Sequence, residues 1–292
     1  MIRGSRRCAA LTFLSTLAVT VLGPAISGQV AARAADPPAG DVTGKSEERV
    51  PTDDPTGGAY TSPTLLFIPA GAVPVWNVRV TLSSEFQSPY DTADAPSPDS
   101  GIRPGLGVEL GLPLGITIGA GTNWVGGDVN TAGHKDFNLG LSPFFQARLH
   151  IWGDSSGKGF QLGTSATYKF VGFEGDPGEI ELAVSGQYRA DRFEAGLQAV
   201  IGKDFATTDA DAEAHAYALV RVIPQLGLGV AGQVRDGVVI QPGETAYDVV
   251  GGAIASLTLG RYQVGGLFGA STIGLNQGQF GALGQIFASA RF

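Results

Sequence analysis

The chain has 292 residues, of which 44 are Gly, 17 are Pro and one is Cys, and its formal net charge is −8. Glycine is about twice as frequent as in average proteins, and each glycine costs about 1 kcal/mol in a helix relative to alanine, so a helical bundle is excluded. The acidic balance without basic stripes argues against a nucleic-acid-binding protein, and 43% hydrophobic residues argue against wholesale disorder.

The N-terminal residues predict a secretory signal peptide over residues 1–35. Arg3, Arg6 and Arg7 precede an apolar stretch at residues 9–23, which is too short to span a membrane as a helix, and small residues follow. Cleavage near Ala35 would remove the only cysteine together with four basic residues and no acidic one, which shifts the net charge from −8 to −12. We therefore expect an exported protein without disulfides.

Residues 36–74 predict a flexible acidic linker and a periplasmic segment that leads into the folded domain. The first part is rich in Pro, Gly, Asp and Glu and poor in bulky apolar residues, which is typical of a tether. A short apolar stretch follows at residues 65–71. This stretch either packs at the entrance of the domain or plugs the interior of the domain. We favour packing at the entrance.

Hydrophobicity alternates with period two from residue 75 to residue 292. Since successive side chains of a strand point to opposite faces, each segment of this kind has one apolar and one polar face. We count twelve predicted strands, at residues 75–87, 102–112, 115–125, 136–151, 159–171, 179–189, 192–203, 213–223, 226–235, 246–259, 261–271 and 281–292.

The connections between these strands alternate between very short turns and longer loops. An even strand number with this alternation is typical of barrels in bacterial outer membranes, whose closure leaves no unbonded strand edge in hydrocarbon. The predicted fold class is therefore all-β: a closed antiparallel transmembrane barrel of about twelve strands in an up-and-down meander.

Two features favour a membrane barrel over a soluble sandwich or barrel. Aromatic residues gather on the apolar face near both strand ends, as in the girdles of lipid-facing barrels. The residues at the short-turn end are Trp76, Phe160, Tyr188, Phe193, Tyr262 and Phe292, and those at the long-loop end are Phe86, Trp124, Phe137, Phe170, Tyr247 and Phe268. The opposite face carries too many charges for a dry core. Pro143 lies inside a predicted strand, where we expect a bulge or a break.

The final residues carry a resemblance to a known class. A terminal Phe292 is preceded by Ala290, Ala288 and Ile286 at every second position. This pattern resembles the C-terminal signal of Gram-negative outer-membrane β-barrel proteins, although that signal prefers a bulkier residue where Ala290 stands. The resemblance implies outer-membrane lipid and the barrel-assembly machinery as partners and the cell outer membrane as location, without identifying one family.

The inward face suggests what the lumen does. Many inward positions are Gly, which either leaves an open lumen or relieves crowding between coiled strands. Arginines gather near the short-turn end and acids near the long-loop end, where charged rings would set ion preference. We expect a lumen constriction of Arg79, Arg148, Arg189, Arg221, Arg291, Glu109 and Glu194, and an acidic outer mouth of Glu85, Glu179, Glu181 and Asp248. In the alternative interpretation the arginines pair with Glu109 and Glu194 and brace the barrel.

The leading function is a porin-like channel or transporter for small solutes, acting as a monomer. One alternative is a structural or adhesive barrel that acts through its outer loops, and another is an outer-membrane hydrolase. No catalytic constellation, metal site or cofactor motif is evident, and nucleic acid is not expected as a partner. His134 with Asp128 and Asp136 is the only loop cluster of suitable side chains, and we interpret it as loop composition.

Overall fold

The computed structural model describes residues 60–90, 100–125, 128–129, 140–154, 157–170, 178–205, 210–238, 247–272 and 280–292. The predicted signal peptide and the tether up to residue 59 lie outside the described residues, as do His134 and Asp136. In the described part of the chain, no helix is long and apolar enough to cross a membrane.

Strands make up almost all of the regular structure. The long strands are β1 (Val78–Tyr90), β2 (Ser100–Leu112), β3 (Ile116–Val125), β5 (Gly140–Trp152), β6 (Gly159–Lys169), β7 (Glu179–Arg189), β8 (Phe193–Asp204), β9 (Ala210–Ile223), β10 (Leu226–Val238), β11 (Tyr247–Leu259), β12 (Tyr262–Ser271) and β13 (Phe280–Arg291). A two-residue strand, β4 (Asp128–Val129), pairs with β2, and a single 3-10 turn, Pro113–Gly115, connects β2 to β3.

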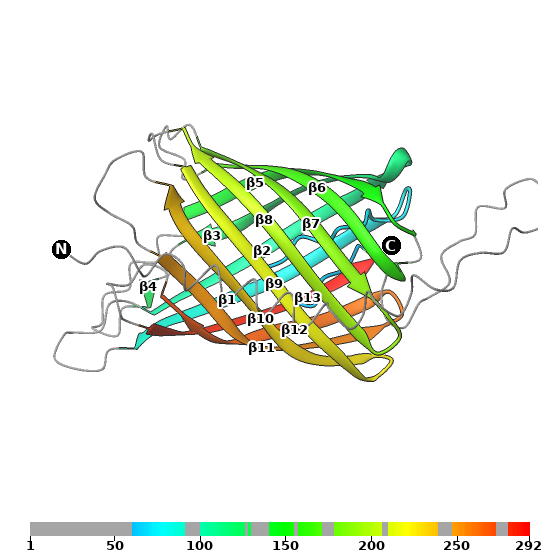
Figure 1. Cartoon of the computed structure of the whole chain (residues 1–292). Helices are drawn as coiled ribbons and strands as arrows, with labels where there is room; N and C mark the ends of the chain where they lie inside the picture. Colours follow the sequence, from blue (N-terminus) through cyan, green and yellow to red (C-terminus); the bar gives the residue numbers. More distant parts are fainter. Residues whose placement is uncertain are drawn as a thin grey trace, which may run out of the picture. The chain divides into compact units, whose positions relative to one another are not determined.

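The twelve long strands form one closed antiparallel sheet in which each strand pairs with its neighbours in sequence (Figure 1). The ring closes because β1 pairs with β2 on one side and with β13 on the other, from Arg79↔Arg291 to Tyr90↔Phe280. The predicted fold class, a closed antiparallel barrel of twelve strands in a sequential meander, is confirmed.

The predicted strand boundaries agree closely with the structure, and the exception at Pro143 is informative. β7 spans the predicted residues, whereas β9 and β10 extend further toward the long-loop end than expected. The expected bulge or break at Pro143 is wrong, since Pro143 pairs with Thr122 in continuous register. Its carbonyl accepts a hydrogen bond from the Phe170 N–H at 2.9 Å, so the donor that proline lacks falls where the β5–β6 ladder ends.

The outward face of the barrel is apolar. Large hydrophobic side chains are exposed at alternate positions of the strands, for example Leu82, Leu182, Val230 and Ile286. Soluble monomers rarely expose a continuous apolar surface of this kind, and lipid contact explains it. Of the predicted girdle residues, six are among the exposed large side chains: Trp76, Phe86, Phe160, Tyr262, Phe268 and Phe292. The side chains of Trp124, Phe137 and Tyr247 lie outside the described ones.

A cross-link between β1 and β13 tests closure of the ring. Val78 and Phe292 exchange both backbone bonds, so Thr81 and Ser289, three positions further along, form a non-hydrogen-bonded pair. Such pairs bring Cα atoms to about 4.5 Å, within disulfide range. We expect Thr81→Cys with Ser289→Cys to oxidise and to give a band that migrates faster on a boiled non-reducing gel.

The matched control replaces Ser289→Cys by Ser256→Cys on β11, which two strands separate from β1. A cross-link in the control pair, or none in the Thr81–Ser289 pair, would contradict the closed register.

Candidate functional site

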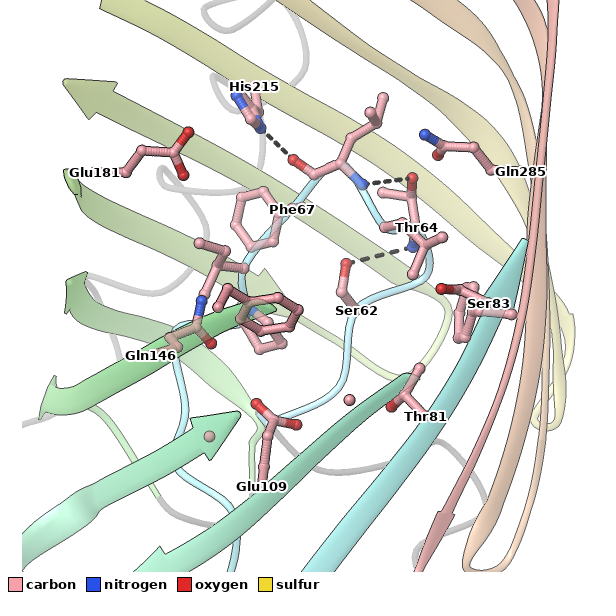
Figure 2. Close-up of a pocket in the computed structure, with 18 of the residues that line it drawn as sticks. Ser62, Thr64, Phe67, Thr81, Ser83, Glu109, Gln146, Glu181, His215 and Gln285 are labelled. Carbon is pink, nitrogen blue, oxygen red and sulfur yellow. Dashed lines mark hydrogen bonds between the residues drawn. The ribbon is translucent and has the colours of Figure 1, made fainter. Parts of the chain in front are cut away.

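A segment that precedes β1, residues 60–74, lies inside the barrel and is called the plug segment below (Figure 2). The Tyr60 hydroxyl accepts a hydrogen bond at 2.7 Å from an arginine at the short-turn end of β13. The Leu66 carbonyl lies deeper, where it is hydrogen-bonded to the imidazole of His215 on β9. The Val73 N–H then donates at 2.9 Å to a threonine near the start of β3. The segment therefore enters from the short-turn end, turns near the middle of the lumen and returns to begin β1.

This path corrects the interpretation that the apolar stretch packs at the domain entrance. Phe67, Ala70 and Val73 are each 3% exposed or less, although none of them belongs to a strand. The alternative interpretation, a lumen plug, describes their surroundings, because the partners of this stretch are inward-facing side chains of the barrel wall.

Glutamine side chains of the wall bind the backbone of the plug segment. The Gln187 amide bridges its two limbs: its Oε1 accepts from the Ala70 N–H at 3.3 Å and its Nε2 donates to the Thr61 carbonyl at 3.2 Å. Gln198 accepts from the Ile68 N–H at 3.4 Å. A segment without a strand partner must satisfy its buried backbone groups in this way, because an unpaired buried N–H or C=O is costly. These glutamines therefore hold the segment in place.

Three inward glycines make room for the plug segment. A Cβ at Gly111 would lie 2.1 Å from the Pro74 carbonyl oxygen, and one at Gly163 would lie 2.2 Å from the Ala70 carbonyl oxygen. A Cβ at Gly196 would lie 2.7 Å from the Phe67 ring. At Gly111 and Gly163 the segment therefore occupies the space of the missing side chain, whereas at Gly196 the Tyr217 ring, 2.3 Å from such a Cβ, is nearer than Phe67. Gly107 differs, since nothing lies within 4 Å of a Cβ there.

The predicted constriction residues form two charge clusters. In the first, Glu109 on β2 accepts from Arg79 and forms an ion pair with Arg148 at 2.7 Å. Arg148 also donates to the Pro69 carbonyl at 3.4 Å, so this cluster contacts the plug segment. Arg291 stands opposite Arg79 in the β1–β13 register, and its guanidinium lies 5.5 Å from the centre of the Tyr60 ring.

The second cluster is centred on Glu194, which is 1% exposed. Its carboxylate accepts from Arg189 at 2.9 and 3.0 Å, from Arg221 at 2.7 Å and from the Tyr217 hydroxyl at 2.8 Å. Gln187 donates to the same carboxylate at 3.1 Å. Four of the five predicted arginines are thus paired with the two glutamates, which is the geometry of the bracing interpretation.

A cavity of about 590 Å³ lies in the lumen next to the plug segment. Its wall includes Glu85, Glu179 and Glu181 of the predicted outer mouth, whereas the side chain of Asp248 lies outside the described ones. Polar side chains from most of the strands complete the wall: Arg79, Glu109, Gln146, Lys169, Gln198, Glu213, His215, Gln233, Arg235, Gln263 and Gln285.

The charges of the cavity wall are partly compensated. Lys169 pairs with Glu181 and, at 4.0 Å, with Glu179. Gln285 donates to Glu85 at 2.7 Å. Carboxylates still outnumber guanidinium and ammonium groups on the wall of this cavity. The wall of this cavity is therefore acidic.

Glu213 and His215 also belong to this site, although the sequence pattern did not single them out. Glu213 accepts from Gln233 at 2.9 Å and lies 3.6 Å from Arg235, and its carboxylate is 2.7 Å from His215 Nε2. The other nitrogen of this imidazole is bonded to the Leu66 carbonyl. The inward phase of both residues was readable from the sequence, but their contact with the plug segment was not.

Apolar side chains of the wall gather around Phe67 on the side of the barrel formed by β9 to β13. The Tyr217 ring lies 4.8 Å from the Phe67 ring in an edge-to-face arrangement with an interplanar angle of 79°. The remaining members of this apolar cluster are Leu219, Ala231, Val250, Ile254, Leu267 and Leu283. Such aromatic contacts add about 0.5–1.5 kcal/mol beyond burial, so Phe67 anchors the tip of the plug segment.

The described residues hold no group of three or more His, Cys, Asp or Glu side chains that could bind a metal ion. The C-terminal residues Ile286, Ala288, Ala290 and Phe292 occupy the outward phase of β13 and its end, with Ile286 and Phe292 well exposed. Their role as an assembly signal stays a prediction.

Comparison with known proteins supports the architecture and leaves the substrate open. No family model matches the chain, and no curated protein sequence is similar to it. Among solved structures, the COG4313 outer membrane channel from Pseudomonas putida F1 is similar with a TM-score of 0.54 and 12% identity, over 76% of this chain and 98% of that one. The NanC porin has a TM-score of 0.51 and 8% identity, over 72% and 98% of the two chains.

The KdgM porin, solved in complex with disordered oligogalacturonate, is similar with a TM-score of 0.50 and 10% identity, over 73% of this chain and 99% of that one. Identities this low establish a shared fold only. That fold is the barrel of small outer-membrane channels and porins.

The buried Glu194 cluster predicts a large loss of stability on neutralising its carboxylate. Glu194→Gln leaves Arg189 and Arg221 without their counter-ion, and removing one partner of a buried ion pair typically costs about 3–5 kcal/mol. We expect the midpoint of urea unfolding in detergent to fall sharply. The control is Asp191→Asn, which breaks the exposed Lys158–Asp191 pair and should cost about 0–1 kcal/mol. Equal effects of the two changes would contradict the assignment.

The glycine positions predict how tightly the plug segment is held. Ser62→Cys places a buried reporter thiol on the segment in a mature chain that we expect to lack cysteine. Adding Gly163→Ala should displace the segment and raise the rate of maleimide labelling severalfold, because the new Cβ collides with Ala70. Adding Gly107→Ala should leave the rate unchanged, since that Cβ meets nothing. Equal labelling rates would show that the segment is not packed against Gly163.

Proposed function

We propose that this outer-membrane β-barrel protein is a channel for small solutes whose conductance is controlled by the plug segment. The observation that carries the proposal is the lumen itself: a cavity of about 590 Å³ with a polar wall is bounded by a segment that no strand ladder holds. A barrel that serves only as a membrane anchor does not require a polar cavity in its lumen. The similarity to channels and porins supports the same conclusion.

The charged residues have two roles in this proposal. The Glu109 and Glu194 clusters brace the short-turn half and hold the plug segment through Arg148 and Gln187. The acidic wall near the long-loop end favours cations and neutral solutes over anions, as charged rings do in other pores. The guanidinium groups become an electrostatic constriction only when the segment leaves.

Planar-bilayer recording tests the proposal. Deleting residues 61–73 removes the part of the plug segment that occupies the lumen and keeps the tether and β1. We expect small currents from the mature protein and a conductance at least severalfold higher from the deletion variant. The matched control deletes residues 41–53, which is an equal length of the predicted tether, and should conduct like the mature protein.

A folded deletion variant without conductance would refute the channel and leave a structural barrel. Folding is checked by heat-modifiable migration on a gel, since a closed barrel resists unfolding before boiling. A control deletion that conducts as well as the 61–73 deletion would show that the plug segment does not limit the current.

A further inference from the structure

The two sides of the lumen differ in chemistry at the depth of Phe67. Strands β9 to β13 present the apolar cluster, and strand register makes it one continuous patch: Leu219 pairs with Gly229, Gly229 with Ile254, and Ile254 with Leu267. Strands β7 and β8 present Gln187 and Gln198 instead. The interior wall of a water-filled porin is polar, so an apolar patch of this size points to a function other than conducting water and ions.

The Phe67 ring is buried against the apolar patch. Phe67 is 3% exposed and Leu219 and Leu267 are 1% exposed or less, so the patch and the ring enclose one another. Tyr217 meets the Phe67 ring edge to face, and its hydroxyl is fixed at 2.8 Å by Glu194. The Tyr217 ring is therefore held in place by its hydrogen bond to Glu194 in the second charge cluster.

Polar side chains bind the amide groups on both sides of the same ring. His215 is hydrogen-bonded to the carbonyl of Leu66, the residue before Phe67. Gln198 accepts from the N–H of Ile68, the residue after it. Figure 2 shows the hydrogen bond from His215 to this part of the segment, with Phe67 beside it. Together the lumen groups recognise an aromatic ring flanked by amides.

The cavity extends from this place to inward side chains near the long-loop end. Its wall contains Leu66, Phe67, Gln198 and His215 as well as the acidic residues of the outer mouth. A solute that enters past those carboxylates therefore meets the Phe67 site before the Glu194 cluster, which does not line the cavity. The acidic path disfavours anions and admits neutral and cationic solutes.

We propose that the Phe67 site is the solute-binding site of the channel, that its ligands are small neutral or cationic aromatic compounds carrying an amide, and that the tip of the plug segment occupies it as an internal mimic. The proposal rests on the proposed function and names its substrate class. A bound aromatic solute replaces Phe67, and the segment then loses its apolar anchor. Solute binding and opening of the lumen are thereby coupled.

Current block in the variant lacking residues 61–73 tests the site. The probe is N-acetyl-L-phenylalaninamide, which reproduces the ring and both flanking amides, and the matched probe is N-acetyl-L-alaninamide. We expect the phenylalanine amide to block half of the current at a concentration at least tenfold lower. In the mature protein it should need a higher concentration, because the tethered Phe67 competes at an effective concentration of about millimolar order. In a variant that conducts, equal block by the two probes, or none, would overturn the proposal.

Substitutions in the deletion variant locate the binding. Leu267→Asn places a polar group in the apolar patch and should raise the half-blocking concentration of the phenylalanine amide about tenfold. Ser83→Ala changes the cavity wall on β1, away from the patch, and should leave it unchanged. If Leu267→Asn does not fold, Leu267→Ala provides the same comparison. Block that is indifferent to position 267 would place the probe elsewhere and refute the site.

A second readout separates failure of this inference from failure of the proposed function. Thermal unfolding of the deletion variant in detergent should shift upward with the phenylalanine amide and not with the alanine amide, whether or not the variant conducts. Stabilisation without conductance would support the site and refute the channel. Conductance with neither block nor stabilisation would leave the channel standing and refute the aromatic site.

Discussion

The seam between β1 and β13 closes the ring, and its register runs unbroken from Arg79↔Arg291 to Tyr90↔Phe280. In hydrocarbon an unpaired strand edge has no water to satisfy it, so only a closed sheet is stable there. Closure also fixes an inside. Once the ring is closed, every second side chain of each strand points into the lumen. The rest of the structure consists of the groups that fill this lumen.

The lumen is filled by two means that depend on one another. Near the short-turn end, Glu109 and Glu194 each bind two arginines, so few of these charges remain uncompensated at depth. The plug segment occupies the adjoining space, where Gln187 contacts both the segment and Glu194. Burial without partners would be costly for the carboxylates and for the backbone of the segment. Each part therefore supplies the hydrogen bonds that the other requires.

The glycines show where prediction from sequence succeeded and where it stopped. Their inward phase was readable, and two explanations followed from it, an open lumen or relief of crowding. The structure shows both and adds a third: Gly107 faces open space, Gly265 would collide with the Phe287 ring, and Gly163 faces the backbone of Ala70. The alternation of side chains along a strand assigns each residue to one face of the sheet. It does not show which groups lie across the lumen from that residue. The same limit applied to Pro143, whose missing donor is harmless only because β6 ends beside it.

The sequence by itself determined the strand segments, the two faces, the closed barrel of twelve strands and which charges point inward. These follow from the alternation of side chains along a strand, which is a local property. Only the tertiary structure decided that the arginines divide between Glu109 and Glu194, that His215 binds the Leu66 carbonyl, and that Phe67 fills the apolar patch. Those contacts depend on register between strands and on the path of a segment without periodicity, and neither is set by residues close in sequence.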